Sequence, residues 1–595
     1  MSPFKKTVLP LILSIVIIAV MYYEMIQPIN IQSTAFWWFL IYCVVIVAVL
    51  FGLPRMHEAG GSFFEDVRDE GLGYFKNRKA DRENKASGKS RSLSPAMVAV
   101  GLVVIMVLII FVGNIVSSPF FNARAYSSLL DVEDGDFAED ISEISMNSVP
   151  VVDRDTAVRL GSRTIGEMSD LVSQYAIDES SSAYTQISYQ ETPYRVSSLV
   201  YADIIKWITN TAAGLPGYVK VNMVTQETEL VRLEEGNYMH YSTGEHFNNY
   251  LYRYVRFQYP TEIFGEAAFE IDDNGTPYWI VPTVKYRIML FGGEDYDGAI
   301  LVNACTGETT RYDLADIPQW CDKVFNADLV YSQLGSYGKY RSGFWNSLIG
   351  QSGVLVPTGS SAPSLFSDDD DDSSSVSSSS TSGYNYLAID DDVYMYTGMT
   401  SANSDESLVG FVLVNLRTKE TGYYTCAGAT ETSAMRSAEG QVQQMSYSAT
   451  SPLLLNIADR PTYFLSLKDD AGLVKMYAFI DVQRYQIVGT GSTITEAQSN
   501  YIAALGNDDE VDVDTSELES DVELDTLEAS GKIEAIESVV KDGNSYFYFK
   551  LVGDEHIYVA AIGIDDALPF LKAGEKVTVS YTGDGSTREV TAFTE

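Results

Sequence analysis

The chain has 595 residues, of which 46% are hydrophobic, and a formal charge of −41 from 81 acidic and 40 basic residues. This length predicts several domains, and so acidic a chain disfavours negatively charged partners, nucleic acid above all. The four cysteines (Cys43, Cys305, Cys321 and Cys426) are too scattered for a disulfide framework; a Cys305–Cys321 bridge and buried free thiols are both open alternatives.

Three apolar stretches, at about 7–26, 35–53 and 95–116, predict three transmembrane helices because each approaches the roughly 20 residues that cross a bilayer. Residues 1–116 carry 11 basic and 8 acidic side chains, which leaves 29 basic and 73 acidic ones in the rest of the chain. Nine of the 11 basic residues within residues 1–116 lie in the loop 54–94. The positive-inside rule therefore predicts that the N-terminus and loop 54–94 are cytoplasmic and that residues 117–595 are extracytoplasmic.

The predicted helices carry no charge near their centres, which favours anchoring in the lipid bilayer over transport. Trp37 and Trp38 suit a bilayer interface. Residues 63–68 form either an interfacial helix against the inner leaflet or part of a solvated basic loop.

A motif of the form Gly-x-x-x-Val-Asn-x-x-Thr-x-Glu-Thr occurs three times, which predicts a repeated structural module. Its fixed residues, which we interpret as structural, are Gly217, Asn222, Thr225, Glu227 and Thr228; Gly298, Asn303, Thr306, Glu308 and Thr309; and Gly410, Asn415, Thr418, Glu420 and Thr421. Each copy has β-rich runs on both sides of a short polar segment, which indicates a β-hairpin whose Asn bonds the turn backbone.

A further strand and a helix precede each hairpin, so the predicted module is α-β-β-β. A degenerate fourth unit pairs residues 461–465 with 475–481. The expected helices are 153–175, 244–257, 314–326, 430–445 and 494–505.

These elements predict an α+β fold: three N-terminal transmembrane helices, tandem α-β-β-β repeat modules outside the membrane, and a small all-β, OB-like C-terminal barrel. The expected divisions are 1–116 for the helices, 117–152 for a juxtamembrane segment, 153–357 for the first modules, 358–383 for a disordered Ser/Asp linker, 384–506 for further modules, 507–530 for an acidic linker and 531–595 for the barrel.

The hairpin resembles the PepSY module of bacterial secreted and membrane proteins, in which a Thr-Gly turn joins two strands. Thr306-Gly307 matches that turn, whereas Gln226 and Lys419 replace the glycine in the other copies. The resemblance covers about residues 155–495. It implies an extracytoplasmic, non-catalytic module that modulates peptidases or other envelope proteins, and no functional residue carries over from it.

No pattern in the sequence indicates a catalytic, cofactor or metal site. His240 and His246 are the histidines open to a nucleophile–base role, with no nucleophile elbow nearby. Residues 270–275 and 390–392 offer carboxylates to calcium but lack EF-hand spacing, and we interpret the first as a hairpin turn and the second as a solvated strand end. Tyr250, Tyr252 and Tyr254 either line a peptide or glycan site or pack against a sheet.

The sequence thus predicts a membrane-anchored extracytoplasmic binding, scaffolding or regulatory protein of the bacterial cell envelope. The expected partners are the lipid bilayer and an envelope protein or peptide, and no cofactor or catalysis is expected. Two alternatives stay open, an envelope hydrolase with a site between modules and a membrane signal transducer.

Overall fold

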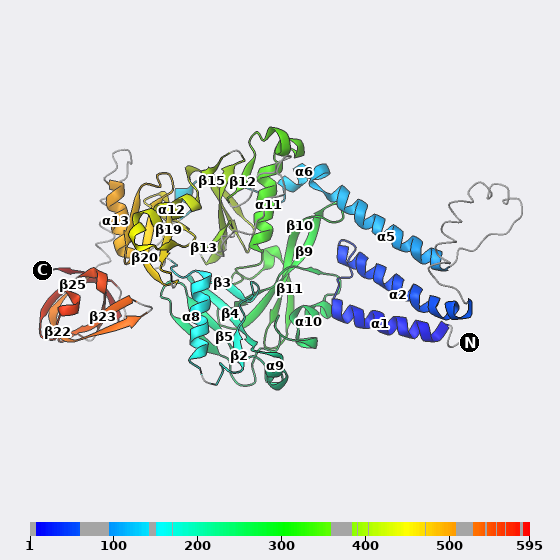
Figure 1. Cartoon of the computed structure of the whole chain (residues 1–595), viewed down its shortest axis with the longest axis horizontal. Helices are drawn as coiled ribbons and strands as arrows, with labels where there is room; N and C mark the ends of the chain where they lie inside the picture. The colour runs from blue at the N-terminus through cyan, green and yellow to red at the C-terminus, as the bar shows by residue number, and fades with distance from the viewer. Residues whose placement is uncertain are drawn as a thin grey trace, which may run out of the picture.

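The computed structural model describes residues 7–59, 95–141, 150–358, 383–506 and 527–594, with short gaps at 169, 390, 403, 471, 542–543, 555, 566 and 583–586. Three helices lie side by side at one end of the molecule, a β-rich body follows, and a small barrel lies at the other end (Figure 1). The interpretations of residues 63–68, and of nearly all of both linkers, lie outside the described residues.

The prediction of three transmembrane helices is wrong, because among the residues that the structure describes two helices, rather than three, are long and apolar enough to cross a membrane. These are α2 (Thr34–Ala59), with the apolar window Thr34–Phe51, and α5 (Pro95–Ser117), with the window Met97–Ser117. The helix α1 (Leu9–Met25) has 17 residues, and it ends where Ile26 takes a left-handed backbone with φ of 46°. At 1.5 Å per residue it is about 26 Å long, short of the roughly 30 Å hydrocarbon core.

Beyond α5 the chain enters the body through the short elements α6 (Pro119–Ser127), β1 (Glu133–Asp134) and α7 (Phe137–Asp140). The body consists of four units, each a helix followed by five strands. Unit 1 contains α8 (Arg154–Gly166), β2 (Tyr175–Ile177), β3 (Tyr184–Tyr189), β4 (Thr192–Tyr201), α9 (Ile204–Asn210), β5 (Gly217–Asn222) and β6 (Thr228–Arg232). Unit 2 contains η3 (Phe247–Asn249), α10 (Leu251–Gln258), β7 (Ile263–Phe264), β8 (Ala268–Ile271), β9 (Pro277–Ile288), β10 (Gly292–Asn303) and β11 (Thr309–Asp313).

The other two units follow in the same order. Unit 3 contains η4 (Leu314–Asp316), α11 (Ala327–Tyr340), η5 (Asn346–Gly350), β12 (Leu355–Pro357), β13 (Asn385–Ile389), β14 (Asp392–Ser401), β15 (Ser404–Asn415) and β16 (Thr421–Ala429). Unit 4 contains α12 (Glu431–Gln441), η6 (Gln443–Met445), β17 (Ser448–Ala449), β18 (Leu453–Ile457), β19 (Arg460–Lys468), β20 (Val474–Asp481), β21 (Val488–Gly491) and α13 (Ile494–Gly506).

All four sheets share one strand order. The third strand of each unit pairs on one side with both the first and the second strand, and on the other side with the fourth, which pairs in turn with the fifth. These pairings within a unit are all antiparallel. Four sheets with one topology show that the chain is built from a repeated unit.

The predicted α-β-β-β unit is wrong in its number of strands, and the body is mostly β. The missed strands are as short as the two residues of β7 and β17, too short to show a period of two. The predicted helix 314–326 is also wrong, because the chain makes one 3-10 turn there and α11 begins only after Asn326, whose side chain accepts the Asp328 N–H at 2.8 Å.

Two apolar cores join the four units, and a third core belongs to the barrel. Units 1 and 2 meet through β3, β4 and β8, units 1 and 3 through β3, β13 and β14, and units 3 and 4 through β13 and β18. The barrel is closed by β22 (Leu527–Lys541), β23 (Asn544–Leu551), β24 (Ile557–Ala561), β26 (Thr587–Thr594) and β25 (Lys576–Thr582), with 3-10 turns η7 (Ile562–Ile564) and η8 (Leu568–Phe570).

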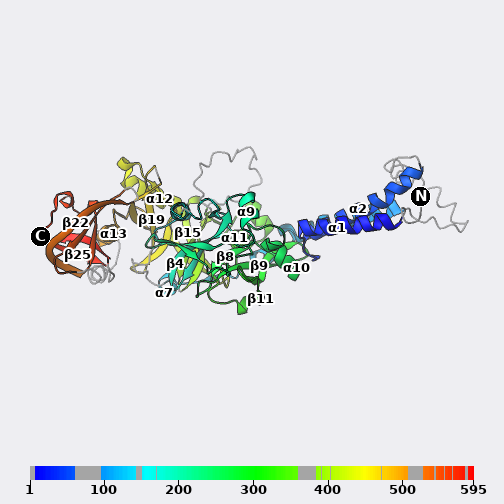
Figure 2. The same ribbon diagram turned by 90° about the horizontal axis from the view of Figure 1, so that it is seen from below.

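Two buried arginines of α10 fasten the body to the end of α1. Arg253 donates through Nε to the Tyr23 carbonyl at 2.9 Å, and Arg256 donates through Nε to the Ile26 carbonyl at 2.9 Å. These carbonyls belong to the C-terminal end of α1, where cations are favourable. The body is therefore held against the helix ends rather than tethered by a loose linker (Figure 2).

Candidate functional site

The three motif copies build one hydrogen-bonded turn. In the second copy, Asn303 Oδ1 accepts the N–H groups of Cys305 and Thr306 at 3.0 and 2.9 Å, and Thr306 Oγ1 accepts the Glu308 N–H at 3.2 Å. Asn222 and Asn415 each accept the corresponding two N–H groups of their own copies. Thr225 and Thr418 each accept the N–H group of the motif Glu, as Thr306 does. The residue after Thr is left-handed in every copy: Gln226, Gly307 and Lys419 have φ between 63° and 74°.

The first motif position requires glycine for a steric reason that is separate from the turn. A Cβ on Gly217, Gly298 or Gly410 would lie 2.2, 2.1 or 2.6 Å from a backbone carbonyl oxygen of the neighbouring fifth strand. Real Cβ atoms do not approach that closely, so the fourth and fifth strands of units 1, 2 and 3 need glycine where they come together. The motif residues Glu227, Glu308 and Glu420 accept the N–H of the motif Asn through their backbone carbonyls and close the hairpin.

The fifth strands β6 and β11 form open sheet edges. The Asn222 N–H donates to the Glu227 carbonyl, and the Leu233 N–H donates to the Pro216 carbonyl. Because backbone groups alternate in direction along an antiparallel strand, those of Thr228, Leu230 and Arg232 point away from β5. The same pattern turns Thr309, Arg311 and Asp313 away from β10. Within the described residues no backbone hydrogen bond reaches these outward groups, and β11 lies at the margin of the body in Figure 2.

The equivalent edge of unit 3 is occupied. There β1 pairs in parallel with β16, with Asp134 opposite Tyr423, and Gly135 donates its N–H to the Tyr423 carbonyl at 3.0 Å. Tyr423 is the eighth residue after Asn415, just as Leu230 and Arg311 are the eighth residues after Asn222 and Asn303. The fold therefore contains one example of an extended segment on an edge that is open in units 1 and 2.

A buried acidic junction joins units 1, 2 and 3. Glu270 of β8 accepts the N–H groups of Asp322 and Lys323 at 2.8 Å each, and Asp322 Oδ2 accepts the Ser188 N–H at 2.7 Å. Asp391 lies beside them and accepts the Ser188 hydroxyl at 3.1 Å. The side chains of Glu270 and Asp322 are 0% exposed, so no substrate in solution reaches them in this conformation.

Burial raises the pKa of Glu270 to about 8, partly opposed by its two backbone hydrogen bonds and by Lys323. Burial, and then the charge of Glu270, raise the pKa of Asp322. Asp322 Oδ1 has no hydrogen-bond partner among the described residues. A proton on one of the two carboxyl groups therefore stabilises the junction. Sequence reasoning missed Asp322 and Ser188, because they approach Glu270 only when three units fold together.

Among the described residues, no hydrogen bond joins the side chain of His240 or His246 to a Ser, Thr or Cys side chain. His246 packs its ring edge-on against Trp207, with centroids 4.9 Å apart, and the His240 backbone donates to Ala304. Tyr252 and Tyr254 lie on α10 and tie it to the sheet: Tyr252 Oη accepts the Ala267 N–H, and Tyr254 donates to the Gly307 carbonyl.

The cysteines and the two acidic clusters also have structural places. Asp392 of the second cluster is 8% exposed, and its carboxylate accepts hydrogen bonds from Asn415 and Arg417, so the interpretation of that cluster as a solvated strand end is wrong. Cys305, Cys321 and Cys426 are free thiols. Asp272 Oδ1 accepts the N–H groups of Asn274 and Thr276, so residues 272–276 form a turn. Within the described part of the chain no group of three or more His, Cys, Asp or Glu is arranged to hold a metal ion.

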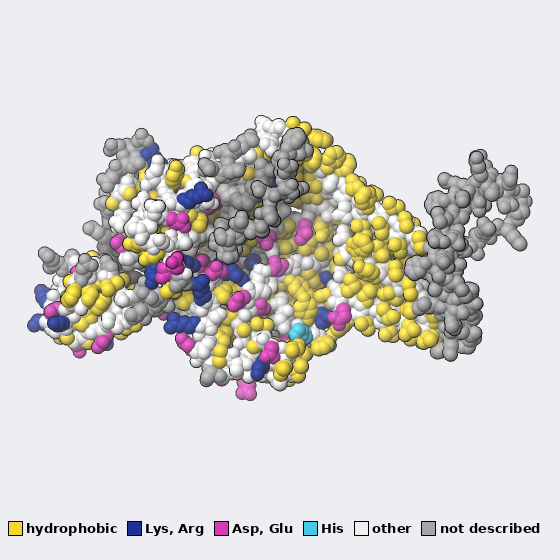
Figure 3. Space-filling view, viewed as in Figure 1, with side chains coloured by type: hydrophobic (Ala, Val, Ile, Leu, Met, Phe, Trp, Pro, Cys, Tyr) yellow, Lys and Arg dark blue, Asp and Glu magenta, His cyan; other side chains and the backbone are white. Residues whose placement is uncertain are grey.

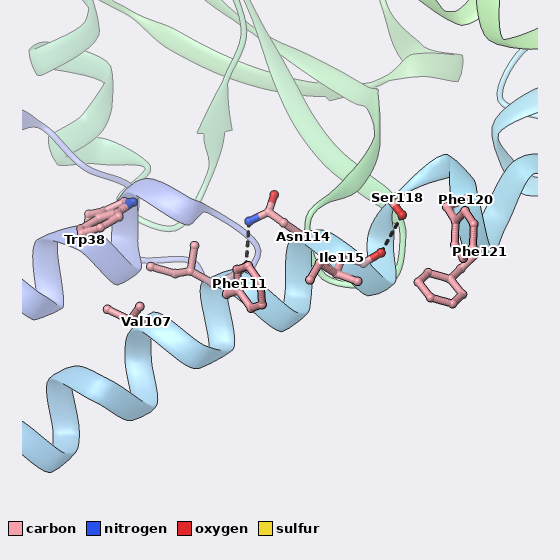
Figure 4. Close-up of a pocket in the computed structure, with 9 residues that line it drawn as sticks. Trp38, Val107, Phe111, Asn114, Ile115, Ser118, Phe120 and Phe121 are labelled. Carbon is pink, nitrogen blue, oxygen red and sulfur yellow. Dashed lines mark hydrogen bonds between the residues drawn. The ribbon is translucent and has the colours of Figure 1, made fainter. Parts of the chain in front are cut away.

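An apolar groove of about 730 Å³ lies between α2, α5 and α6. Trp38, Phe111, Phe120 and Phe121 line it, and Asn114 supplies a polar side chain that donates to the Ile110 carbonyl at 2.8 Å (Figure 4). A second groove of about 560 Å³ lies where Met289 and Leu290 of the β9–β10 turn meet α5. Both recesses belong to the surface of the long apolar helices.

No family model matches the chain, and neither does any curated protein. Among solved structures, the polysaccharide lyase Uly1 aligns over 71% of this chain and 84% of its own, with 10% identity and a TM-score of 0.16. A levansucrase mutant from B. megaterium aligns over 77% of this chain and 96% of its own, with 8% identity and a TM-score of 0.15.

Proposed function

We propose that this chain is a membrane-anchored scaffolding protein of the bacterial cell envelope, which binds extended segments of other polypeptides along the open edges β6 and β11. The proposal concerns binding, without catalysis. The observation that supports it is the pairing of β1 with β16, in which the fifth-strand edge of unit 3 carries an added strand. Addition of a strand to an exposed edge is a general mode of peptide recognition.

The anchor in this proposal consists of α2 and α5, which cross the membrane in opposite directions. The connecting loop then lies on the cytoplasmic side, where its excess of basic residues is favourable. The β body and the barrel lie on the extracytoplasmic side. The resemblance of the hairpin to PepSY modules supports such a role, and the burial of Glu270 and Asp322 favours a structural role for the acidic junction over hydrolysis.

Photo-crosslinking in cells tests this proposal. A photoreactive amino acid at Glu229 of β6 or Thr310 of β11, both exposed, is expected to link the full-length chain to the same envelope polypeptide, and the matched control at the distant Met445 is expected not to. Equal linking at the control position would contradict binding at these edges.

A further inference from the structure

The largest exposed apolar side chains of the body gather at its membrane end. Nine large hydrophobic side chains are more than half exposed within the described residues of 118–506. They are Phe121, Ile204, Ile205, Ile208, Phe247, Phe257, Met289, Trp345 and Ile349, with exposed fractions between 54% and 70%. We call this set the membrane-proximal apolar face. A patch of exposed apolar surface on a protein marks an interaction site.

Contacts place one side of this face at the end of α1. The Phe257 ring lies 6.0 Å from that of Tyr22 and 6.1 Å from that of Tyr23. Arg253, which bonds the Tyr23 carbonyl, also donates to the Phe247 carbonyl at 2.8 Å. The Phe247 ring in turn lies 5.8 Å from that of Trp207, the residue of α9 that lies between the exposed Ile205 and Ile208.

The other side of the face adjoins α5. Phe121 lies in α6, four residues after the end of α5, and its neighbour Phe120 lies 5.8 Å from Trp345, ring centroid to centroid. Ile349 belongs to the turn η5 that follows Trp345. Met289 lines the groove where the β9–β10 turn meets α5. Figure 3 shows apolar side chains continuing from the long helices onto the adjoining part of the body.

The chemistry of this face suits a bilayer interface. Tryptophan and phenylalanine favour the level of the lipid headgroups, and an apolar helix face can lie in that plane. Exposed basic side chains accompany the aromatic ones: Arg124 lies in α6 and Arg341 precedes Trp345. Residues 117–595 carry 29 basic and 73 acidic side chains, so this apolar face differs from the charged character of the rest of the surface.

We infer that the membrane-proximal apolar face lies in the outer leaflet of the bilayer that α5 crosses, so that the body is embedded at the lipid interface through α9, η3, η5 and α6. The occupant is the lipid of the same membrane, because the face is continuous with the surface of α5. This inference rests on the membrane anchoring in the proposed function. It makes the orientation of β6 and β11 relative to the membrane fixed rather than variable.

Fluorescence quenching by brominated lipid tests the inference. The full-length chain carries single added cysteines with an environment-sensitive fluorophore at Ile205, Met289 or Trp345, in phosphatidylcholine vesicles with and without bromine on the acyl chains. The unsubstituted protein corrects for labelling of the native cysteines. Leu108→Cys in α5 reports whether that helix is in the bilayer, and Met445→Cys serves as the matched exposed position away from the face.

Probes at Ile205, Met289 and Trp345 are expected to lose roughly half or more of their fluorescence, as the probe at Leu108 does, while the probe at Met445 keeps its fluorescence. Quenching at Leu108 without quenching at Ile205 and Trp345 would overturn the inference and leave the anchor in place. Absence of quenching at Leu108 as well would overturn the anchoring itself.

Discussion

Ser188 donates its backbone N–H to Asp322 Oδ2 at 2.7 Å, and this bond joins the first sheet of the body to the segment between the second and third sheets. The acceptor is a buried carboxyl group whose second oxygen has no partner among the described residues. Together with Glu270 it places two ionisable groups at the junction of three repeated units, so the stability of the body depends on a proton.

The first prediction concerns pH. The pKa of Glu270 rises from 4.5 in the unfolded chain to about 8 in the folded one, so the folded state retains a proton that the unfolded state releases. This contribution to stability is complete below about pH 4.5 and is lost as the pH rises toward 8, at up to about 1.4 kcal/mol per pH unit. Glu270→Gln is expected to flatten the fall in the free energy of unfolding between pH 5 and 8, measured by denaturant titration. The exposed Glu229→Gln serves as the control, and an unchanged slope in Glu270→Gln would count against the account.

The second prediction concerns the motif glycine. Gly298→Ala places a Cβ 2.1 Å from the Tyr312 carbonyl oxygen, and neither strand can move freely. We expect a loss of about 3 kcal/mol in the free energy of unfolding. Gly335→Ala in α11 is the matched control, because apart from its two chain neighbours and the nearby backbone of its own helix no atom lies within 4 Å of its added Cβ, and it is expected to stabilise by about 0.5–1 kcal/mol. Similar losses in both variants would contradict the explanation.

The third prediction separates the copies of the turn. Asn415 is 2% exposed and also donates through Nδ2 to Asp392 at 2.8 Å, which in turn binds Arg417. Asn415→Ala leaves that buried carboxylate short of a donor and is expected to cost about 2–3 kcal/mol, whereas Asn222→Ala is expected to cost about 1 kcal/mol. Thermal unfolding of both variants checks the order, and a reversed order would show that the turns are held differently.

The fourth prediction concerns the attachment of the body to the helices. Arg256 is 4% exposed and holds the Ile26 carbonyl at 2.9 Å, and burial lowers its pKa to about 10. Arg256→Met removes the donor to that carbonyl and to the carbonyls of Tyr259 and Glu262, with an expected cost of about 3 kcal/mol. We expect faster protease cleavage within residues 26–33 of the full-length chain, while the exposed Arg232→Met leaves the cleavage rate unchanged. Equal rates in both variants would contradict the docking described here.

Sequence reasoning went furthest where the pattern was local. The hydrogen bonds of Asn303 and Thr306 follow from residues within six positions, so the motif by itself indicated a turn. The strands β7 and β17 have two residues each and exist through pairing with long third strands, which no local pattern reports. The junction of Ser188, Glu270 and Asp322 spans 134 residues and depends on tertiary structure alone.

The length of α1 shows a different limit. Hydropathy extends through Ile26, but the left-handed backbone of that residue ends the helix and leaves 17 residues. The prediction of three transmembrane helices was wrong there because apolar composition does not determine where a helix begins and ends.

Proline substitution at the open edge tests strand addition most directly. Leu230→Pro removes one outward N–H group from β6 without removing a bond to β5, and proline is tolerated on edge strands. Leu230→Met changes the side chain and keeps the N–H group. The account predicts that the crosslink from Glu229 to its envelope polypeptide is lost in Leu230→Pro and kept in Leu230→Met, with equal unfolding temperatures. A crosslink that survives in Leu230→Pro would contradict backbone pairing at this edge.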